Sequence, residues 1–220
     1  MRAVDERLEA AKEGAWREVA AIDAAYAAAE LDEAEWHAAM AALVVPAYVS
    51  AKTPEAGSGS SRDAVGWEYA RSLIAEAVEP GQTFLDVGCA NGHLMASMAE
   101  WAGVEPYGLE ISPELAELAR RRLPRWADRI WIGNAADWVP PRRFDVVRSG
   151  LDYVPTTHRR DLVEHLLGFC DRLVVGVHNE ERDESGLAGI AAGWGFAIAG
   201  TAERPHPHPS LAYKAFWIDN

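Results

Sequence analysis

The sequence contains little cysteine and no long apolar run. Its two cysteines, Cys89 and Cys170, are too few for a disulfide framework and are typical of a protein kept in a reducing compartment. No apolar stretch approaches the roughly 20 residues that a membrane-spanning helix needs. The amino-terminal segment MRAVDERLEAAKE mixes charges of both signs and lacks the apolar region of a secretory signal. We therefore expect a cytoplasmic protein without a membrane partner.

Basic residues are also scarce. The 220 residues include 21 Lys and Arg against 34 Asp and Glu, which gives a formal net charge of -13. Because this charge repels phosphate groups, we expect no nucleic-acid partner and no docking to anionic lipid. The hydrophobic fraction of 49% and the charged fraction of 25% are typical of a globular chain. The length fits one domain of ordinary size with a helical extension.

The amino-terminal region is rich in alanine and glutamate at helical spacing. This pattern predicts helices over residues 3–29 and 32–44, with Asp32 at the start of the second helix and Pro46 at the end of the region. The segment AKTPEAGSGSSRD is typical of a loop because it gathers glycine, serine, proline and aspartate. A third helix is predicted over residues 63–78, and the Pro-Gly pair that follows ends it.

From Thr83 onward, short apolar runs alternate with helical patterns. The predicted strands span residues 83–88, 105–110, 129–134, 144–149, 172–178, 195–203 and 211–219. The predicted helices between them span residues 91–102, 113–123, 157–169 and 183–193. This alternation favours an α/β fold with a parallel sheet, and the last two strands form an antiparallel hairpin. We therefore divide the chain into a helical cap or lid (1–60), for which a solubilising extension is the alternative, and one compact catalytic unit (61–220).

The segment TFLDVGCANGHL carries the sharpest functional signal. An apolar strand enters a turn that contains Gly88 and Gly92, and a helix follows at once. Glycine permits a sharp turn and close approach of a ligand, and the free N–H groups of the new helix face that ligand. Ligands of open parallel sheets bind at the carboxyl ends of the strands. The turn does not match the G-x-G-x-x-G pattern of dinucleotide-binding proteins, because Ala90 lies between its glycines.

An acid at the end of the second predicted strand supports a nucleotide-type ligand. Glu110 lies 18 residues beyond Gly92, which is about the spacing at which an acid accepts hydrogen bonds from ribose hydroxyls in Rossmann-like sites. Ser112 and Pro113 follow it as a helix cap and a first helical residue, so part of this signal is structural.

The order Asp86, Gly88, Ala90, Gly92 resembles the first motif of the class I S-adenosylmethionine-dependent methyltransferases, with Ala in place of the middle glycine. A strand of the FDVV type and the following segment through Pro155 are also similar to that family. The resemblance covers about residues 60–220. It implies a Rossmann-like sheet of seven strands, mostly parallel with an antiparallel carboxyl-terminal strand and helices on both faces. It also implies S-adenosyl-L-methionine as the cofactor.

The resemblance further implies roles for individual residues. Glu110 is assigned to the ribose of the cofactor and Ile111 to the face of the adenine. The adenine amino group is assigned to Asn134 or Asp137, and Ser149 is expected beside the methyl donor. The full expected cofactor set is Asp86, Gly88, Cys89, Ala90, Gly92, Glu110, Ile111, Asn134, Ala135, Asp137 and Ser149.

The methyl acceptor is expected to be a small molecule that presents an oxygen or nitrogen atom. Transfer from a sulfonium needs mainly in-line positioning and exclusion of water, so a base is required only for an acceptor that holds its proton. His178 and Tyr153 are the candidate catalytic groups, and Tyr48 and Trp67 join them as candidate lining residues. The His-Pro-His sequence that begins at His206 is expected to be a loop, so no metal is expected.

Other functions share parts of these patterns. A nicotinamide-dependent oxidoreductase has the same ribose acid but needs the glycine pattern that is missing here. A non-catalytic protein that binds S-adenosylmethionine would keep all the binding motifs. Methyl transfer to nucleic acid is opposed by the net charge and by the lack of a motif for an extruded base amine. A monomer and a homodimer are both compatible with the sequence.

Overall fold

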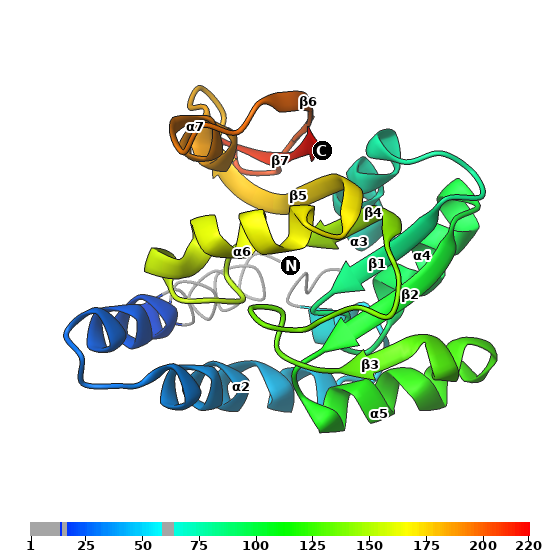
Figure 1. The fold of residues 1–220 in the computed structure, drawn as a ribbon, viewed down its shortest axis with the longest axis horizontal. Coiled ribbons are helices and arrows are strands. Elements are labelled where there is room, and N and C mark those ends of the chain that lie inside the picture. The colour runs from blue at the N-terminus through cyan, green and yellow to red at the C-terminus, as the bar shows by residue number, and fades with distance from the viewer. Residues whose placement is uncertain (1–13, 15–16, 59–63) are drawn as a thin grey trace.

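The computed structural model describes residues 14, 17–58 and 64–220. Its centre is a seven-stranded sheet with the order β3-β2-β1-β4-β5-β7-β6, drawn in Figure 1. The strands are β1 Thr83–Val87, β2 Glu105–Glu110, β3 Ile130–Ile132, β4 Phe144–Ser149, β5 Cys170–Glu181, β6 Ile198–Pro205 and β7 Leu211–Asp219. The first five strands are parallel, and β7 runs antiparallel to both β5 and β6. The predicted fold class is confirmed.

The helices follow the sequence pattern with several changes. They are α2 Glu33–Ser50, α3 Ala64–Arg71, α4 His93–Ala102, α5 Pro113–Arg122, α6 Arg159–Leu167 and α7 Gly186–Gly193. Asp32 caps α2 as expected, because its side chain accepts from the Glu35 amide while the Glu35 side chain accepts from the Asp32 amide. The helix predicted over residues 63–78 is instead α3 followed by a 3₁₀ segment, Ser72–Ala77.

The prediction that Pro46 ends the amino-terminal helical region is wrong. Pro46 lies inside α2, which continues to Ser50. The side chain of Pro46 is exposed, so the carbonyl that loses its helical partner lies on the side of the helix that water can reach. Of the helix predicted over residues 3–29, the structure shows residues 17–27 as helical. Most of the part before residue 17 lies outside the described residues.

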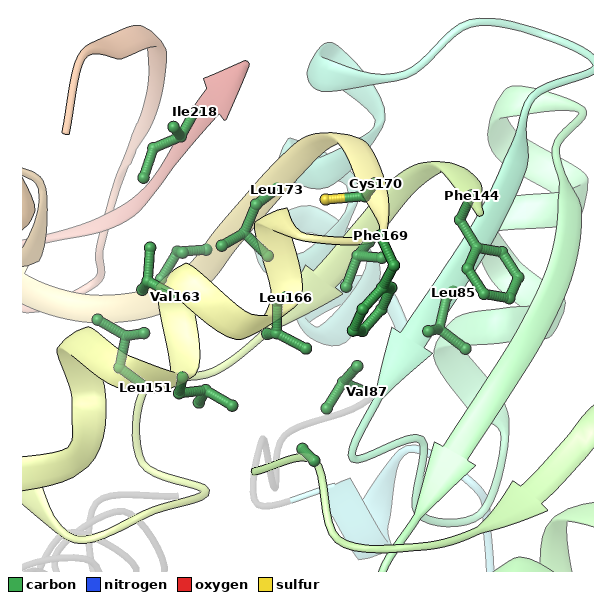
Figure 2. Packing of buried hydrophobic residues seen from close by; sticks show 14 of the residues in the cluster. Leu85, Val87, Phe144, Leu151, Val163, Leu166, Phe169, Cys170, Leu173 and Ile218 are labelled. Carbon is green, nitrogen blue, oxygen red and sulfur yellow. The ribbon is translucent and has the colours of Figure 1, made fainter. Parts of the chain in front are cut away.

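Side chains from the two faces of the sheet form separate buried clusters. One cluster joins β1, β4 and β5 to α6, and Figure 2 shows Leu166 of α6 turned toward Val87 of β1. The opposite cluster joins the other face of the sheet to α3, α4 and the 3₁₀ segment that follows α3. Successive residues of a strand point to opposite faces, so the apolar runs of the sequence fill both clusters.

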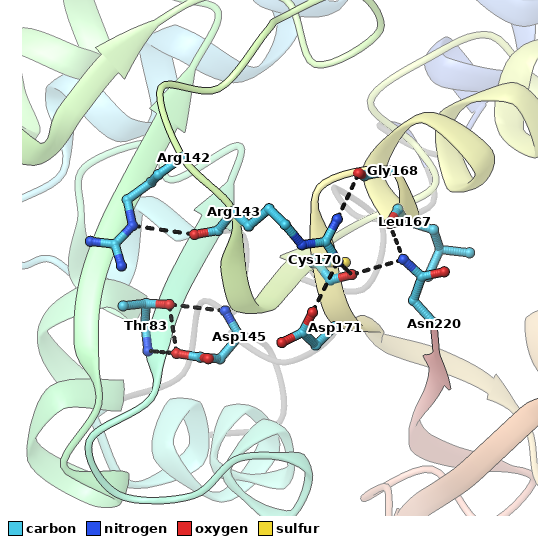
Figure 3. A network of polar contacts seen from close by, with 9 residues as sticks. All are labelled: Thr83, Arg142, Arg143, Asp145, Leu167, Gly168, Cys170, Asp171 and Asn220. Carbon is cyan, nitrogen blue, oxygen red and sulfur yellow. Dashed lines mark hydrogen bonds and ion pairs between the residues drawn. The ribbon is translucent and has the colours of Figure 1, made fainter.

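Polar contacts fix the amino-terminal ends of the central strands, which lie away from the glycine turn. The Asp145 carboxylate accepts from the amide and the hydroxyl of Thr83, at 2.7 Å each, and thereby ties the start of β4 to the start of β1. Arg143 donates to the carbonyls of Gly168 and Cys170, and Asn220 donates to the Cys170 carbonyl from the other side (Figure 3). These contacts hold the strands in register, which positions their opposite ends.

The amino-terminal helices lie beyond the carboxyl ends of the strands (Figure 1). Asp23 accepts hydrogen bonds from Trp36 of α2 at 2.8 Å and from Thr156, which follows β4, at 2.7 Å. Tyr26 contacts His158 at 3.2 Å between the hydroxyl and Nε2. Residues 17–27 and α2 are called the cap below. No helix in the described part of the chain is long and apolar enough to cross a membrane.

Candidate functional site

The turn between β1 and α4 has three residues in the left-handed region, Gly88 at φ 70°, Ala90 at φ 47° and Gly92 at φ 73°. A Cβ atom on Gly88 would lie 2.6 Å from Cζ of Tyr153, and one on Gly92 would lie 2.7 Å from Cδ1 of Leu123. The left-handed conformation therefore favours glycine at both positions, and at Gly88 the ring of Tyr153 also occupies the space of a Cβ atom. Ala90 has this conformation without that freedom, which stores some backbone strain at the site.

Glu110 at the end of β2 holds this turn in place. Its carboxylate is buried and accepts from the amide of Ala90 at 2.8 Å and from the amide of Ser112 at 2.9 Å. Each oxygen makes one of these bonds and can accept another, which suits the two hydroxyls of a ribose. Burial raises the pKa of Glu110, and hydrogen bonds from the backbone amides of Ser112, Ala90 and Ile111 lower it.

Asp86, at the end of β1, forms a buried ion pair that the sequence did not predict. Its partner Arg148 stands beside it in the register of β1 with β4, and Nη1 lies 3.3 Å from Oδ1 of Asp86. The same Nη1 donates to the hydroxyl of Tyr153 at 3.0 Å, and Nε donates to the carbonyl of Gly176 at 2.8 Å. Burial raises the pKa of Asp86 to about 6, although Arg148 lowers it.

This raised pKa gives a testable pH dependence of stability. The Asp86 carboxyl binds its proton more tightly in the folded protein, so the stability it contributes is complete below about pH 4 and is lost as the pH rises through about 6. In Asp86→Asn this loss is absent, and we expect its unfolding free energy to rise relative to wild type between about pH 4 and pH 7. Urea unfolding across this range measures the difference, and parallel profiles would contradict the assignment.

Tyr48 and Arg71 reach the same site from the amino-terminal side of the chain. Tyr48 lies near the carboxyl end of α2, and Arg71 is the last residue of α3. Electrostatic interactions link both residues to Tyr153 and Arg148, and link Tyr48 also to Glu110. Burial raises the pKa of Tyr48, so its hydroxyl is neutral at any ordinary pH. The position of Tyr48 agrees with the lining role predicted from the sequence, which stays a prediction.

Trp67 lies in the core instead of facing a ligand. It is 3% exposed, and its ring lies 4.1 Å from the ring of His93 and 5.5 Å from that of Trp101. This packing replaces the lining role that the sequence predicted for Trp67. His93 also contacts Glu55 at 3.4 Å, so the segment before α3 is fastened over the start of α4. Asn91 adds to this by donating to the carbonyl of Pro54 at 3.0 Å.

The residues expected around the adenine are arranged beyond β2 and β3. Ile111 is exposed, and Ala135 is buried. The amide oxygen of Asn134 accepts from the amide of Ala136 at 3.0 Å, and its amide nitrogen lies 3.3 Å from Nε2 of His37 in α2. Asp137 lies at the turn that follows. The cap therefore contacts the adenine end of the predicted site.

Three further predicted residues are less accessible. Cys89 is buried, and burial raises the pKa of its thiol well above the usual value, so it is a packing residue of the turn. Ser149 is buried, and its hydroxyl donates to the carbonyl of Gly150 at 2.9 Å. The side chain of His178 lies outside what the structure describes, although its backbone pairs with Lys214 beside an irregularity in β5.

Arg148 is the site residue that the sequence reasoning missed. An arginine directly after the apolar pair Val146 and Val147 of a predicted buried strand was the available signal, because a buried charge needs a partner and marks a site more often than an exposed one does. For Arg71 the sequence allows either a surface ion pair with an acid such as Glu76 or contact with a ligand carboxylate. In the structure Glu76 pairs with Arg204 at 3.1 Å, and Arg71 interacts electrostatically with Arg148, Tyr153, Tyr48 and Asp152.

Known proteins share the central part of this chain. Residues 84–170 match a family model described as a methyltransferase domain. The ribosomal protein L11 methyltransferase of Paraburkholderia xenovorans strain LB400 is 32% identical over 123 residues, which is 49% of this chain and 38% of that protein. The corresponding protein of Burkholderia multivorans is 31% identical over the same length. The chain thus spans well under half of the curated relatives it matches.

Solved structures share the fold at low sequence identity. The N-methyltransferase NodS of Bradyrhizobium japonicum WM9, in complex with S-adenosyl-L-homocysteine, aligns with a TM-score of 0.56 and 14% identity over 80% of this chain and 97% of its own. The [4+2]-cyclase SpnF aligns with a TM-score of 0.56 and 14% identity over 71% and 81% of the two chains. A TehB-like methyltransferase of Corynebacterium glutamicum reaches 0.50 with 16% identity over 69% and 87%.

Proposed function

We propose that the protein transfers a methyl group from S-adenosyl-L-methionine to an oxygen or nitrogen atom of a small molecule. The chain has the fold of the class I S-adenosylmethionine-dependent methyltransferases, and residues 84–170 match a methyltransferase domain. The observation that carries the proposal is the joint placement of Glu110 and the glycine turn. A buried carboxylate with remaining acceptor capacity stands directly behind three left-handed residues at the carboxyl edge of a parallel sheet.

The residues present fit the proposed cofactor. Gly88 and Gly92 give the turn its left-handed conformation, and Glu110 has lone pairs left for ribose hydroxyls after its bonds to the amides of Ala90 and Ser112. Asn134 and Asp137 lie at the adenine end. The cofactor supplies an electrophilic methyl group on a sulfonium, so the protein needs chiefly to orient the acceptor in line and to exclude water.

Tyr153 is the group best placed to orient an acceptor. Arg148 has only donors, so the Tyr153 oxygen accepts from Arg148 and its own hydrogen is available to a ligand. Burial raises the pKa of Tyr153 to about 12, which makes it a donor and not a base near neutral pH. An acceptor that holds its proton then needs another base, for which His178 is the candidate from the sequence.

The cap favours a small acceptor over a folded protein. His37 of α2 contacts Asn134 at 3.3 Å, and Asp23 accepts from Thr156 of the segment after β4 at 2.7 Å. The cap thus lies against two sides of the predicted site, which favours a small acceptor. A protein acceptor is the second candidate, because the matched relatives are named as methyltransferases of a ribosomal protein. The fold alone does not fix the reaction, since SpnF, which shares it, is a [4+2]-cyclase.

Two measurements test the proposal. Calorimetry is expected to detect binding of S-adenosyl-L-homocysteine and no binding of NADH, and the opposite preference would support an oxidoreductase. The protein is then incubated with methyl-labelled cofactor and an extract of its host cells. We expect the label in acid-soluble material and its loss in Glu110→Ala. Label in acid-precipitable protein would instead favour the second candidate, and binding without any transfer would favour a non-catalytic role.

A further inference from the structure

Basic residues gather near the amino-terminal ends of the strands, away from the candidate site. Residues 120–143 hold seven of the chain's 21 basic residues and only two acids, although the formal net charge of the chain is -13. Three of the seven, Arg125, Arg129 and Arg142, lie in the segments that lead into β3 and β4. The proposed methyl transfer takes place at the carboxyl ends of the strands, so it gives these three arginines no role.

Two aromatic rings order these arginines. The guanidinium of Arg125 lies over the ring of Trp126, 3.7 Å from its centre. The guanidinium groups of Arg129 and Arg142 lie 5.1 and 5.6 Å from the centre of the Tyr107 ring, and Arg142 also donates to the Tyr107 hydroxyl at 3.3 Å. A guanidinium held against a ring is already ordered, and its remaining N–H groups lie at its edge, where a partner can accept from them. These five residues are called the arginine–aromatic patch.

The positive charge of the patch is only partly compensated. Arg129 pairs with Glu105 at 2.9 Å. Arg125 and Arg142 are both exposed, and no carboxylate of the described residues makes an ion pair with either. Asp145 interacts electrostatically with Arg142 but accepts its hydrogen bonds from the start of β1 (Figure 3). Two arginines of the patch can therefore pair with carboxylates from outside the chain.

An open hollow of about 310 Å³ adjoins the patch. Arg125, Trp126 and Arg129 line it, together with Gly81 and Gly103. The two glycines bring no side chain into the hollow, and the Gly81 amide donates to the Gly103 carbonyl at 2.9 Å. A hollow that is open to solvent and borders charged groups suits a segment of a larger molecule better than it suits an enclosed small ligand.

We propose that the arginine–aromatic patch binds a short acidic segment of a partner protein, whose carboxylates pair with Arg125 and Arg142 and whose backbone lies along the hollow. Arginine suits this role because its planar donor group matches a carboxylate with two parallel hydrogen bonds. A short segment meets mainly the local cations, since exposed charges more than about 8 Å away are screened at physiological salt. A nucleic acid or a second copy of the chain would bring a large negative charge against the acidic remainder of the surface, which opposes binding.

Fluorescence anisotropy at low salt tests the binding, with labelled hexaglutamate as the probe and labelled hexaglutamine as the matched probe without charge. The full chain is expected to bind hexaglutamate only, and more weakly as salt is added. The double variant Arg125→Met and Arg142→Met is expected to bind it about tenfold more weakly. The control removes two charges elsewhere, by Arg160→Met in α6 and Arg182→Met after β5, where both residues are exposed. It is expected to bind as the unaltered chain does.

Glu105→Gln tests the inference in the opposite direction. It releases Arg129 from its ion pair and leaves the rings in place, so hexaglutamate is expected to bind about threefold more tightly. Glu164→Gln makes the same charge change on α6, where it releases Arg160, and is expected to leave the binding unchanged. Tighter binding cannot result from poor folding, so this comparison holds even where Arg142→Met lowers the thermal unfolding midpoint.

Several results would overturn the inference. Hexaglutamate may be bound by neither the unaltered chain nor Glu105→Gln, or equally by the patch and control double variants. Tighter binding of labelled oligothymidylate than of hexaglutamate, lost in the patch double variant, would assign the patch to nucleic acid. Self-association in sedimentation that the same variant loses would assign it to a second copy of the chain. None of these results bears on the proposed function, which is tested by ligands at the opposite ends of the strands.

Discussion

Replacement of Phe144 by alanine is expected to lower the free energy of unfolding by about 3–5 kcal/mol. Phe144 begins β4 and is 1% exposed. Its ring makes edge contacts with Tyr107 at 5.3 Å and with Trp131 at 6.3 Å, and it belongs to the larger buried cluster shown in Figure 2. Alanine removes the ring and its contacts, and neighbours held by the sheet cannot close the resulting cavity fully.

Urea unfolding measures this loss, and the thermal unfolding midpoint is expected to fall by roughly 10 °C, at about 2–4 °C per kcal/mol for a chain of this size. Phe144→Leu, which keeps most of the volume, is expected to lose less. Val139→Ala is the control, because that side chain is 82% exposed and makes little contribution to the core. A loss of less than about 1 kcal/mol in Phe144→Ala would mean that the cluster repacks around the gap.

The strands could be predicted well because their signal is local. The strands expected at residues 105–110 and 144–149 have the bounds that the structure shows, since a strand buried on both faces is a short apolar run between helical patterns. The antiparallel hairpin at the carboxyl end was also predicted. Its place was not, because β7 is inserted between β5 and β6, and neighbours in a sheet are set by long-range pairing.

The helices before the sheet were predicted less well for physical reasons. Pro46 is a strong break signal, yet an exposed proline can continue a helix where water satisfies the freed carbonyl. The segment after Arg71 winds as a 3₁₀ helix although its spacing is α-helical, and its Leu73 and Ile74 are completely buried. Packing against the sheet sets its geometry there, and this information is absent from local periodicity.

The same difference between local and long-range signals applies to the residues of the candidate site. Glu110 and the glycine turn are recognisable from spacing, because backbone conformation and strand ends fix them. The contacts of Arg148 with Asp86 and Tyr153 depend on the register of β1 with β4, which joins residues 62 positions apart. The place of Tyr48 depends on how α2 packs and that of Arg71 on how α3 packs, and no motif in the sequence encodes that packing.

Replacement of Glu110 is expected to have the largest effect on ligand binding. Glu110→Gln places an NH₂ group against one of the two amides, from Ala90 or Ser112, that the carboxylate now satisfies. It also removes the charge that strengthens hydrogen bonds to ribose hydroxyls. We expect S-adenosyl-L-homocysteine to bind about 10–100-fold more weakly, which corresponds to roughly 1–3 kcal/mol, and Glu110→Ala to lie at the upper end of that range.

Two comparisons separate the ribose role from a general weakening of the fold. Glu105→Gln makes the same charge change at the opposite end of β2, where the side chain pairs with Arg129 at 2.9 Å, and it is expected to leave binding unchanged. The loss in Glu110→Gln is expected to be equal for S-adenosyl-L-homocysteine and 5′-methylthioadenosine, since both carry the ribose. A loss restricted to S-adenosyl-L-homocysteine would place Glu110 at the amino-acid end of the ligand and would overturn the ribose assignment.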